Sequence, residues 1–322
     1  MSIIERMADL LGTIARPNQR PSAPGEEGGI PALDLIERAA SESNERSEFL
    51  VPGEIAGQPE VGRFAVESKA KSRPARPTST TTRTHRVDLD RLRRQSMITP
   101  DGERTPIAEC FRRIKRRILT NVANPKAGVP ANLVLVTSAL AGEGKTFCAI
   151  NLAISIALER DQTVLLVDAD VAKPSFPQAL GLEAEKGLMD VLLDRRIDLA
   201  EVLWKTDIDK LTILPAGTAH QHATELLASD AMRVLLQEMA ERYHDRIIIF
   251  DSPPLLAASE AGVLASRMGQ IVMVVEAGKT TEAALKEALS RIESSNVAGL
   301  LLNKSEGVGL RYYYGGYGYG AK

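Results

Sequence analysis

The sequence predicts an α/β fold with a doubly wound, mostly parallel sheet and helices on both faces. From Asn132 onward, short apolar runs rich in β-branched residues alternate with helical stretches. These runs carry little polar interruption, which is typical of strands buried on both faces of a parallel sheet. A glycine-rich loop also follows the first run and leads directly into an apolar helix, as in phosphate-binding loops. The predicted domain covers residues 105–310.

The elements of this domain follow in regular order. The predicted strands are Leu133–Thr137, Thr163–Asp168, Leu211–Leu214, Arg246–Phe250, Ile271–Val275 and Gly299–Leu302. The predicted helices are Lys145–Arg160, Leu188–Leu193, Thr224–Arg242, Glu260–Arg267 and Glu282–Ser294. A further helix over 105–122 has an apolar stripe opposite a strongly basic face. That basic face is either solvated or in contact with an acidic surface, a neighbouring subunit or anionic lipid.

Both ends of the chain differ from this domain. Residues 1–16 have the spacing of an amphipathic helix, which either packs on the chain's own core or docks on a partner or membrane surface. Residues 17–104 are predicted to be a largely disordered linker, because eight of the 17 prolines lie between residues 17 and 89 and little apolar surface is present to offset the ordering entropy. Five of the six tyrosines lie within the last eleven residues, in a glycine-rich tail over 311–322 that we expect to be flexible.

Composition excludes several classes of protein. The chain has 322 residues and a formal net charge of −2, so it is not built as a polyanion binder and no nucleic-acid partner is expected. Its two cysteines lack disulfide-scaffold or zinc-module spacing and suggest a reducing compartment. No apolar stretch approaches the 18 or so residues of a transmembrane helix, and the charged N-terminus does not read as a signal peptide.

The loop from Ser138 to Thr146 predicts a phosphate site. Gly142 and Gly144 let backbone N–H groups point inward, Lys145 can reach the β- and γ-phosphates, and the Thr146 hydroxyl can ligate Mg²⁺. Ala139 replaces the first glycine of the strict motif. The candidate nucleotide-binding residues are Ala141, Gly142, Glu143, Gly144, Lys145, Thr146, Phe147 and Asn303.

Two predicted strands end in carboxylates. Asp168 and Asp170 follow one strand and Asp251 ends another. One such aspartate is often only a turn or helix cap, but the carboxyl ends of parallel strands share one edge of a sheet, where ligands bind. We therefore expect a Mg-nucleotide site at this edge, with Thr146, Asp168 and Asp251 as the metal-binding residues.

Together these motifs resemble those of the bacterial protein-tyrosine kinases. Ser138–Ala153 looks like the Walker A region of that family, Asp168-Ala-Asp170 like its Walker A′ motif, and Ile248–Asp251 like its Walker B motif. The resemblance covers roughly Thr105 to Lys322, and the long N-terminal extension is similar to tyrosine autokinases that accompany exosortase-linked polysaccharide systems. It implies a P-loop fold of the MinD/ParA-like class.

The resemblance also implies roles for the site residues. Lys145, Asp168, Asp170 and Asp251 would be catalytic, with Asp168 as the base, Asp170 positioning the base or metal, and Asp251 holding Mg²⁺ through water. Asn303 would either read adenine or only form a turn. The phosphoacceptors would be Tyr312, Tyr313, Tyr314, Tyr317 and Tyr319, modified in trans because the tail is long enough to reach a neighbouring subunit.

The implied cofactors are ATP and Mg²⁺, and the implied process is regulation of exopolysaccharide synthesis or export. The implied partners are a transmembrane polysaccharide co-polymerase that activates the kinase, further copies of this chain, and a cognate tyrosine phosphatase. Self-association would use Glu109, Arg112 and Lys115, which resemble the family's E-x-x-R-x-x-R motif. The protein would be cytoplasmic and peripheral at the inner membrane through its partner.

Two other functions stay open. One is a MinD/ParA-like ATPase that acts as an assembly switch without kinase activity, and the other is a non-catalytic nucleotide-dependent scaffold. The tyrosine tail favours the kinase, and so does Leu140, which stands where that ATPase class carries a lysine.

Overall fold

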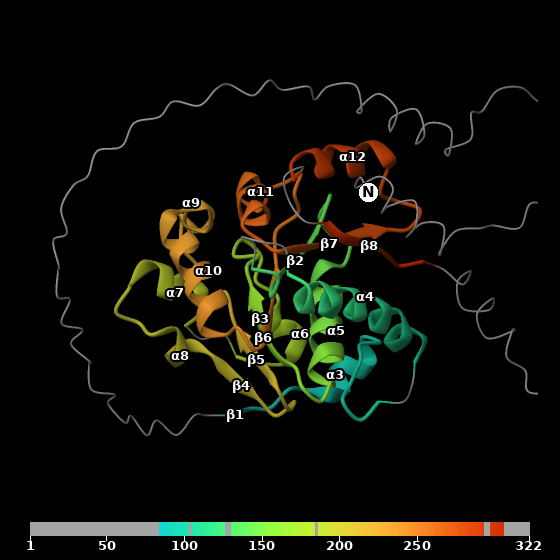
Figure 1. Cartoon of the computed structure of the whole chain (residues 1–322), viewed down its shortest axis with the longest axis horizontal. Coiled ribbons are helices and arrows are strands. Elements are labelled where there is room, and N and C mark those ends of the chain that lie inside the picture. Colours follow the sequence, from blue (N-terminus) through green and yellow to red (C-terminus); the bar gives the residue numbers. More distant parts are fainter. Residues whose placement is uncertain (1–83, 103–104, 126–129, 184–185, 293–296, 306–322) are drawn as a thin grey trace, which may run out of the picture. The chain divides into compact units, whose positions relative to one another are not determined.

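The central feature of the structure is a mostly parallel eight-stranded sheet (Figure 1). The structure is a computed structural model that describes residues 84–102, 105–125, 130–183, 186–292 and 297–305. Its strands, in sheet order, are β1 Thr84–His85, β4 Trp204–Thr206, β5 Leu211–Leu214, β3 Thr163–Asp168, β6 Arg246–Asp251, β2 Leu133–Ser138, β7 Gln270–Glu276 and β8 Val297–Asn303. Among these, β4 and β5 pair antiparallel and every other neighbouring pair is parallel.

Helices cover both faces of the sheet. Alternate residues of β2 belong to two separate hydrophobic clusters, with Leu133 and Leu135 in one and Val134 and Val136 in the other. The cluster of Val134 includes residues of α3 Leu89–Arg94, α4 Pro106–Ala123, α5 Lys145–Ala157 and α6 Phe176–Leu180. The cluster of Leu133 includes residues of α7 Leu188–Leu193, α8 Leu199–Val202, α9 Ala223–Ala228, α10 Asp230–Arg242, α11 Ser259–Ser266 and α12 Glu282–Ser290. The predicted doubly wound fold is therefore confirmed.

One predicted helix is divided in two. The interval Thr224–Arg242 contains α9 and α10, separated at Ser229. Ser229 has an extended backbone, and its hydroxyl oxygen accepts the Met232 N–H at 3.3 Å as the N-cap of α10. A serine side chain competes well for the unpaired N–H groups at a helix start, which explains the break.

The boundary of the predicted linker was placed too late. Residues 84–102 belong to the folded domain, since they form β1 and α3 and bury Val87, Leu92 and Ile98. The Ile98 N–H also donates to Asn151 Oδ1 on α5 at 2.7 Å. The three apolar residues are widely spaced and follow a proline-rich stretch, so the sequence pattern did not separate them from the predicted linker. The rest of the predicted linker, the helix over 1–16 and the tail over 311–322 lie outside the described residues.

The basic helix is α4, and it packs on α5. Its Lys115 side chain is buried, and its Nζ donates to the Ser155 carbonyl at 2.9 Å and pairs with Glu159 Oε1 at 2.6 Å. Glu109 and Arg112 instead pair with each other on the surface of α4. Lys115 therefore holds α4 to α5 and is not free to contact a neighbouring subunit, while the expectation for Glu109 and Arg112 stays a prediction. None of the helices within the described ranges is long and apolar enough to cross a bilayer.

Candidate active site

The loop between β2 and α5 has the backbone of a phosphate-binding turn. Gly142 and Gly144 have φ angles of 85° and 94°, in the left-handed region that glycine adopts without strain. Gly144 is the N-cap of α5, and a Cβ there would lie 2.1 Å from Asn303 Nδ2. Glycine is therefore required at position 144 both for its conformation and for the close approach of Asn303.

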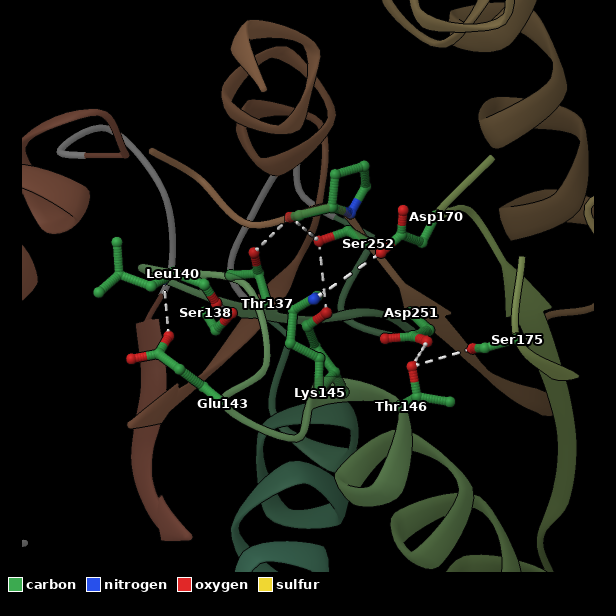
Figure 2. A network of polar contacts seen from close by, with 12 residues as sticks. Thr137, Ser138, Leu140, Glu143, Lys145, Thr146, Asp170, Ser175, Asp251 and Ser252 are labelled. Atoms are coloured by element: carbon green, nitrogen blue, oxygen red, sulfur yellow. Dashed lines mark hydrogen bonds and ion pairs between the residues drawn. The ribbon is translucent and has the colours of Figure 1, made fainter. Parts of the chain in front are cut away.

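Two side chains at the start of α5 reach toward the acidic strand ends (Figure 2). Lys145 is buried, with its Nζ 3.7 Å from Asp170 Oδ2. The Thr146 hydroxyl donates to Asp251 Oδ2 at 2.6 Å and accepts from the Ser175 hydroxyl at 3.1 Å. The predicted cation and hydroxyl thus lie beside the predicted carboxylates.

Asp168 and Asp251 are register partners at the ends of the neighbouring strands β3 and β6. Both side chains are fully buried. Asp168 Oδ2 accepts the N–H groups of Ser175 at 3.0 Å and Phe176 at 3.2 Å. The other oxygen of each carboxylate, Oδ1, is buried and receives no hydrogen bond from the described part of the chain. Two buried acceptor atoms are therefore left for a ligand.

Burial changes the protonation of these carboxylates. It is the main reason that the pKa of Asp168 is raised to about 7, against backbone hydrogen bonds from Phe176, Ser175 and Asp170 that lower it. Burial, followed by the nearby Asp168 charge, raises the pKa of Asp251 to about 8. The pKa of Asp170 is also raised by burial, while Lys145 opposes the shift. Buried acidic groups of this kind gain most from a bound cation.

The arrangement fits a magnesium ion that is completed by phosphate. No group of three or more His, Cys, Asp or Glu side chains suitable for a metal occurs among the residues described. Mg²⁺ in nucleotide sites, however, usually takes one or two carboxylates together with phosphate oxygens and water. The Thr146 hydroxyl and the unpartnered Oδ1 atoms of Asp168 and Asp251 supply oxygen ligands of that kind.

A second set of contacts supports the loop from outside. The buried Glu143 carboxylate accepts the Leu140 N–H at 2.8 Å and the Thr280 hydroxyl. Asn303 Nδ2 donates to the Glu143 carbonyl and Lys304 Nζ to the Gly142 carbonyl, each at 2.8 Å. Asn303 thus lies against the loop, and whether it also reads adenine stays a prediction.

The remaining predicted residues divide by position. Ala141, Gly142, Glu143 and Gly144 lie in the loop, whereas the Phe147 side chain packs against the hydrophobic cluster under α5. The five tail tyrosines lie outside the described residues. Ser175, Thr280 and Lys304 were not predicted, because no motif spacing marks them and their contacts depend on distant parts of the chain.

A separate cavity of about 440 Å³ lies away from these groups. It is lined by Lys186, Ile197, Glu201, Val202 and Trp204. It contains none of the predicted catalytic or nucleotide-binding residues, so the candidate site remains the phosphate-binding loop and the ends of β3 and β6.

Comparison with known proteins identifies the family of this chain. Residues 132–297 match the family model described as an AAA domain. The tyrosine-protein kinase YwqD of Bacillus subtilis is 34% identical over 204 residues, which span 62% of this chain and 84% of YwqD. The succinoglycan biosynthesis transport protein ExoP of Rhizobium meliloti is 34% identical over 225 residues, but they span only 27% of ExoP and 67% of this chain.

A solved structure gives the same result for the fold. The crystal structure of the chimerical protein CapA2B2 superposes with a TM-score of 0.57 at 27% identity, covering 66% of this chain and 90% of the other. The match to YwqD extends over most of that kinase. This chain therefore belongs to the AAA-domain family of P-loop proteins and, within it, to the bacterial tyrosine-protein kinases.

Proposed function

We propose that this protein is an ATP-dependent tyrosine autokinase that phosphorylates the tyrosine cluster of its own C-terminal tail in trans and regulates exopolysaccharide synthesis or export. The observation that carries the proposal is the convergence of Lys145, Thr146, Asp168 and Asp251 at one edge of the sheet. The tail supplies the acceptors, since Tyr312, Tyr313, Tyr314, Tyr317 and Tyr319 follow the kinase domain directly in sequence.

The phosphate-binding loop and Lys145 would hold the ATP phosphates. The N–H groups at the start of α5 and the helix dipole favour anions, and the Lys145 ammonium adds a full positive charge. Mg²⁺, held by Thr146, Asp251 and Asp168, would neutralise charge on the phosphates during transfer. Most of the rate enhancement would then come from positioning and charge stabilisation.

Asp168 would accept the proton of the tyrosine hydroxyl. A tyrosine with a pKa of about 10 is scarcely ionised near neutrality, so its proton has to leave as the new O–P bond forms. The γ-phosphoryl group passes to the tyrosine oxygen, ADP leaves, and the proton goes to Asp168. Without a cation, burial raises the pKa of Asp168 to about 7. Bound Mg²⁺ would favour the ionised carboxylate, which is the form that can accept a proton.

The length of the C-terminal tail favours phosphorylation between subunits. About ten extended residues span roughly 33 Å, which is enough for the tail of one subunit to enter the site of another. Each added phosphate brings about −1.5 to −2 charges, so several on one tail would repel each other and the carboxylates of the site. Phosphorylation would then release the tail and loosen the assembly.

The names of two relatives support the proposed partners of this chain. YwqD is named as a tyrosine-protein kinase, and ExoP, which this chain matches over about a quarter of its length, is named for succinoglycan biosynthesis transport. We infer that a separate transmembrane polysaccharide co-polymerase activates this chain and holds it at the membrane, and that a cognate tyrosine phosphatase resets it.

The test is the formation of phosphotyrosine in purified protein after addition of Mg-ATP, with Lys145→Met as the inactive control. We expect signal in the wild-type protein alone, on peptides from the tail. Phosphate release without phosphotyrosine would instead indicate a MinD/ParA-like ATPase switch, and neither product a nucleotide-dependent scaffold. The exposed Leu140, at the position of that class's lysine, argues against the switch.

A further inference from the structure

Asn303 at the end of β8 and the next residue, Lys304, both donate hydrogen bonds to the phosphate-binding loop. Asn303 Nδ2 donates to the Glu143 carbonyl at 2.8 Å, and Lys304 Nζ donates to the Gly142 carbonyl at 2.8 Å. These are consecutive carbonyl groups of the loop, and they are separated from their donors by 160 and 162 residues in sequence. The contacts therefore join β8 to the middle of the phosphate-binding motif.

Because the peptide bond is planar, a contact that fixes a carbonyl group also fixes the direction of the N–H group in the same peptide unit. In a trans peptide, the C=O of one residue and the N–H of the next point in opposite directions. The Gly142 and Glu143 carbonyls point toward Lys304 and Asn303, so the N–H groups of Glu143 and Gly144 point away from them. Inward N–H groups are what such a loop uses to bind phosphate.

We propose that Asn303 and Lys304 are positioning residues of the phosphate-binding loop. By donating hydrogen bonds to the Glu143 and Gly142 carbonyls, they fix the direction of the loop's N–H groups. This inference rests on the proposed nucleotide site and adds to it a function for the end of β8. It differs from adenine reading, because it acts on the phosphates and is independent of the base.

The end of β7 fixes the two residues in turn. The Ala277 N–H donates to the Asn303 carbonyl at 2.9 Å. Lys304 Nζ lies 3.2 Å from Glu276 Oε1, and Lys279 Nζ lies 3.3 Å from the other oxygen of the same carboxylate. Lys279 and Lys304 thus share one acidic partner, while Lys304 also contacts the Gly142 carbonyl. Lys279 therefore provides a matched control.

The experiment measures displacement of a fluorescent ATP analogue by ATP, GTP and inorganic tripolyphosphate from the full-length protein with Mg²⁺ present. The variants are Asn303→Ala, Lys304→Met, Lys304→Arg and Lys279→Met. We expect Asn303→Ala and Lys304→Met each to weaken all three ligands by the same factor, on the order of tenfold, because a hydrogen bond to a positioned group is lost. Lys304→Arg retains a cationic donor and should recover most of the affinity, and Lys279→Met should bind like wild type.

Two results would overturn the proposal. If Asn303→Ala weakens ATP but leaves GTP and tripolyphosphate unchanged, Asn303 reads the base and does not position the loop. If Lys304→Met and Lys279→Met both bind all three ligands like wild type, the carbonyl contact has no effect. Lys304 is 47% exposed, so its replacement should not prevent folding, and a melting curve without nucleotide verifies this. Phosphotyrosine formation by the wild-type protein is measured separately, so a wild-type protein that binds nucleotide but forms no phosphotyrosine would contradict the proposed function alone.

Discussion

The Thr146 hydroxyl, in the first turn of α5, donates a 2.6 Å hydrogen bond to the Asp251 carboxylate at the end of β6. This bond satisfies one oxygen of a fully buried carboxylate and leaves the other without a donor in the described structure. Asp168, on the adjacent strand β3, is also fully buried and also has one carboxylate oxygen without a donor in the described structure. Without a cation, the site therefore contains two buried acids whose charges are poorly compensated.

The burial of these two carboxylates predicts how the stability of the protein depends on pH. Burial raises the folded-state pKa of Asp251 to about 8 and of Asp168 to about 7, whereas both are near 3.8 when unfolded. Between these values the folded state binds more protons than the unfolded state, so stability falls as pH rises. We expect the melting temperature of the Mg²⁺- and nucleotide-free protein to fall from about pH 5 to about pH 8.

The control is Asp251→Asn, which keeps the size and the acceptor oxygen but cannot ionise. Its melting temperature should fall less over the same range. Equal slopes for the variant and the wild-type protein would show that Asp251 does not titrate in this window.

Lys145→Met should abolish ATP-dependent tyrosine phosphorylation, with a loss of at least about a hundredfold. The change removes the cation proposed to contact the phosphates and keeps a long apolar side chain in a buried position. The fold should persist, because the charged partner of Lys145 is Asp170 at 3.7 Å and not a core residue. Circular dichroism checks the fold and phosphotyrosine detection the activity; near-normal activity in a folded variant would remove Lys145 from the mechanism.

Asp168→Asn should lose phosphoryl transfer by about 10²- to 10⁴-fold while keeping nucleotide binding. The amide oxygen can still accept the Ser175 and Phe176 N–H groups, so the loop after β3 should keep its place. The charge needed to accept a proton is lost. Single-turnover phosphorylation and nucleotide titration separate the two effects, and wild-type turnover would exclude Asp168 as the base.

The sequence was sufficient for the parts of the fold that are set by local pattern. Apolar runs predicted β3 and β5 with their observed bounds, and the glycine spacing predicted the loop before Lys145. The short strand β4 was missed because three residues carry too little periodicity to identify a strand.

Contacts between distant segments could not be predicted in this way. Asn303 and Lys304 reach the loop only because β8 pairs with β7, which lies beside β2. Lys115 lies among arginines in sequence, yet the fold buries its long side chain and places Glu159 at its end. Helical periodicity gives the direction of a residue from its helix axis, but not the neighbour that it meets.

Lys115→Ala should lower the free energy of unfolding by about 1–3 kcal/mol. The change removes the hydrogen bond from α4 to the Ser155 carbonyl of α5 and the ion pair with Glu159, which follows α5. Arg112→Ala, on the same helix, removes only a surface pair with Glu109 and should cost no more than about 0.5 kcal/mol. Urea denaturation measures both, and equal effects would contradict the role assigned to Lys115.

The most direct test of the autokinase proposal combines two defective proteins. One is Lys145→Met with its tail intact, which offers the five tyrosines but cannot transfer phosphate. The other is an active chain truncated after Leu310, which retains the kinase site but lacks the tail. After mixing with Mg-ATP, transfer between subunits predicts phosphotyrosine on the Lys145→Met chain, located by mass spectrometry at Tyr312, Tyr313, Tyr314, Tyr317 or Tyr319. Absence of phosphotyrosine from that chain, while the wild-type protein becomes phosphorylated under the same conditions, would contradict phosphorylation in trans.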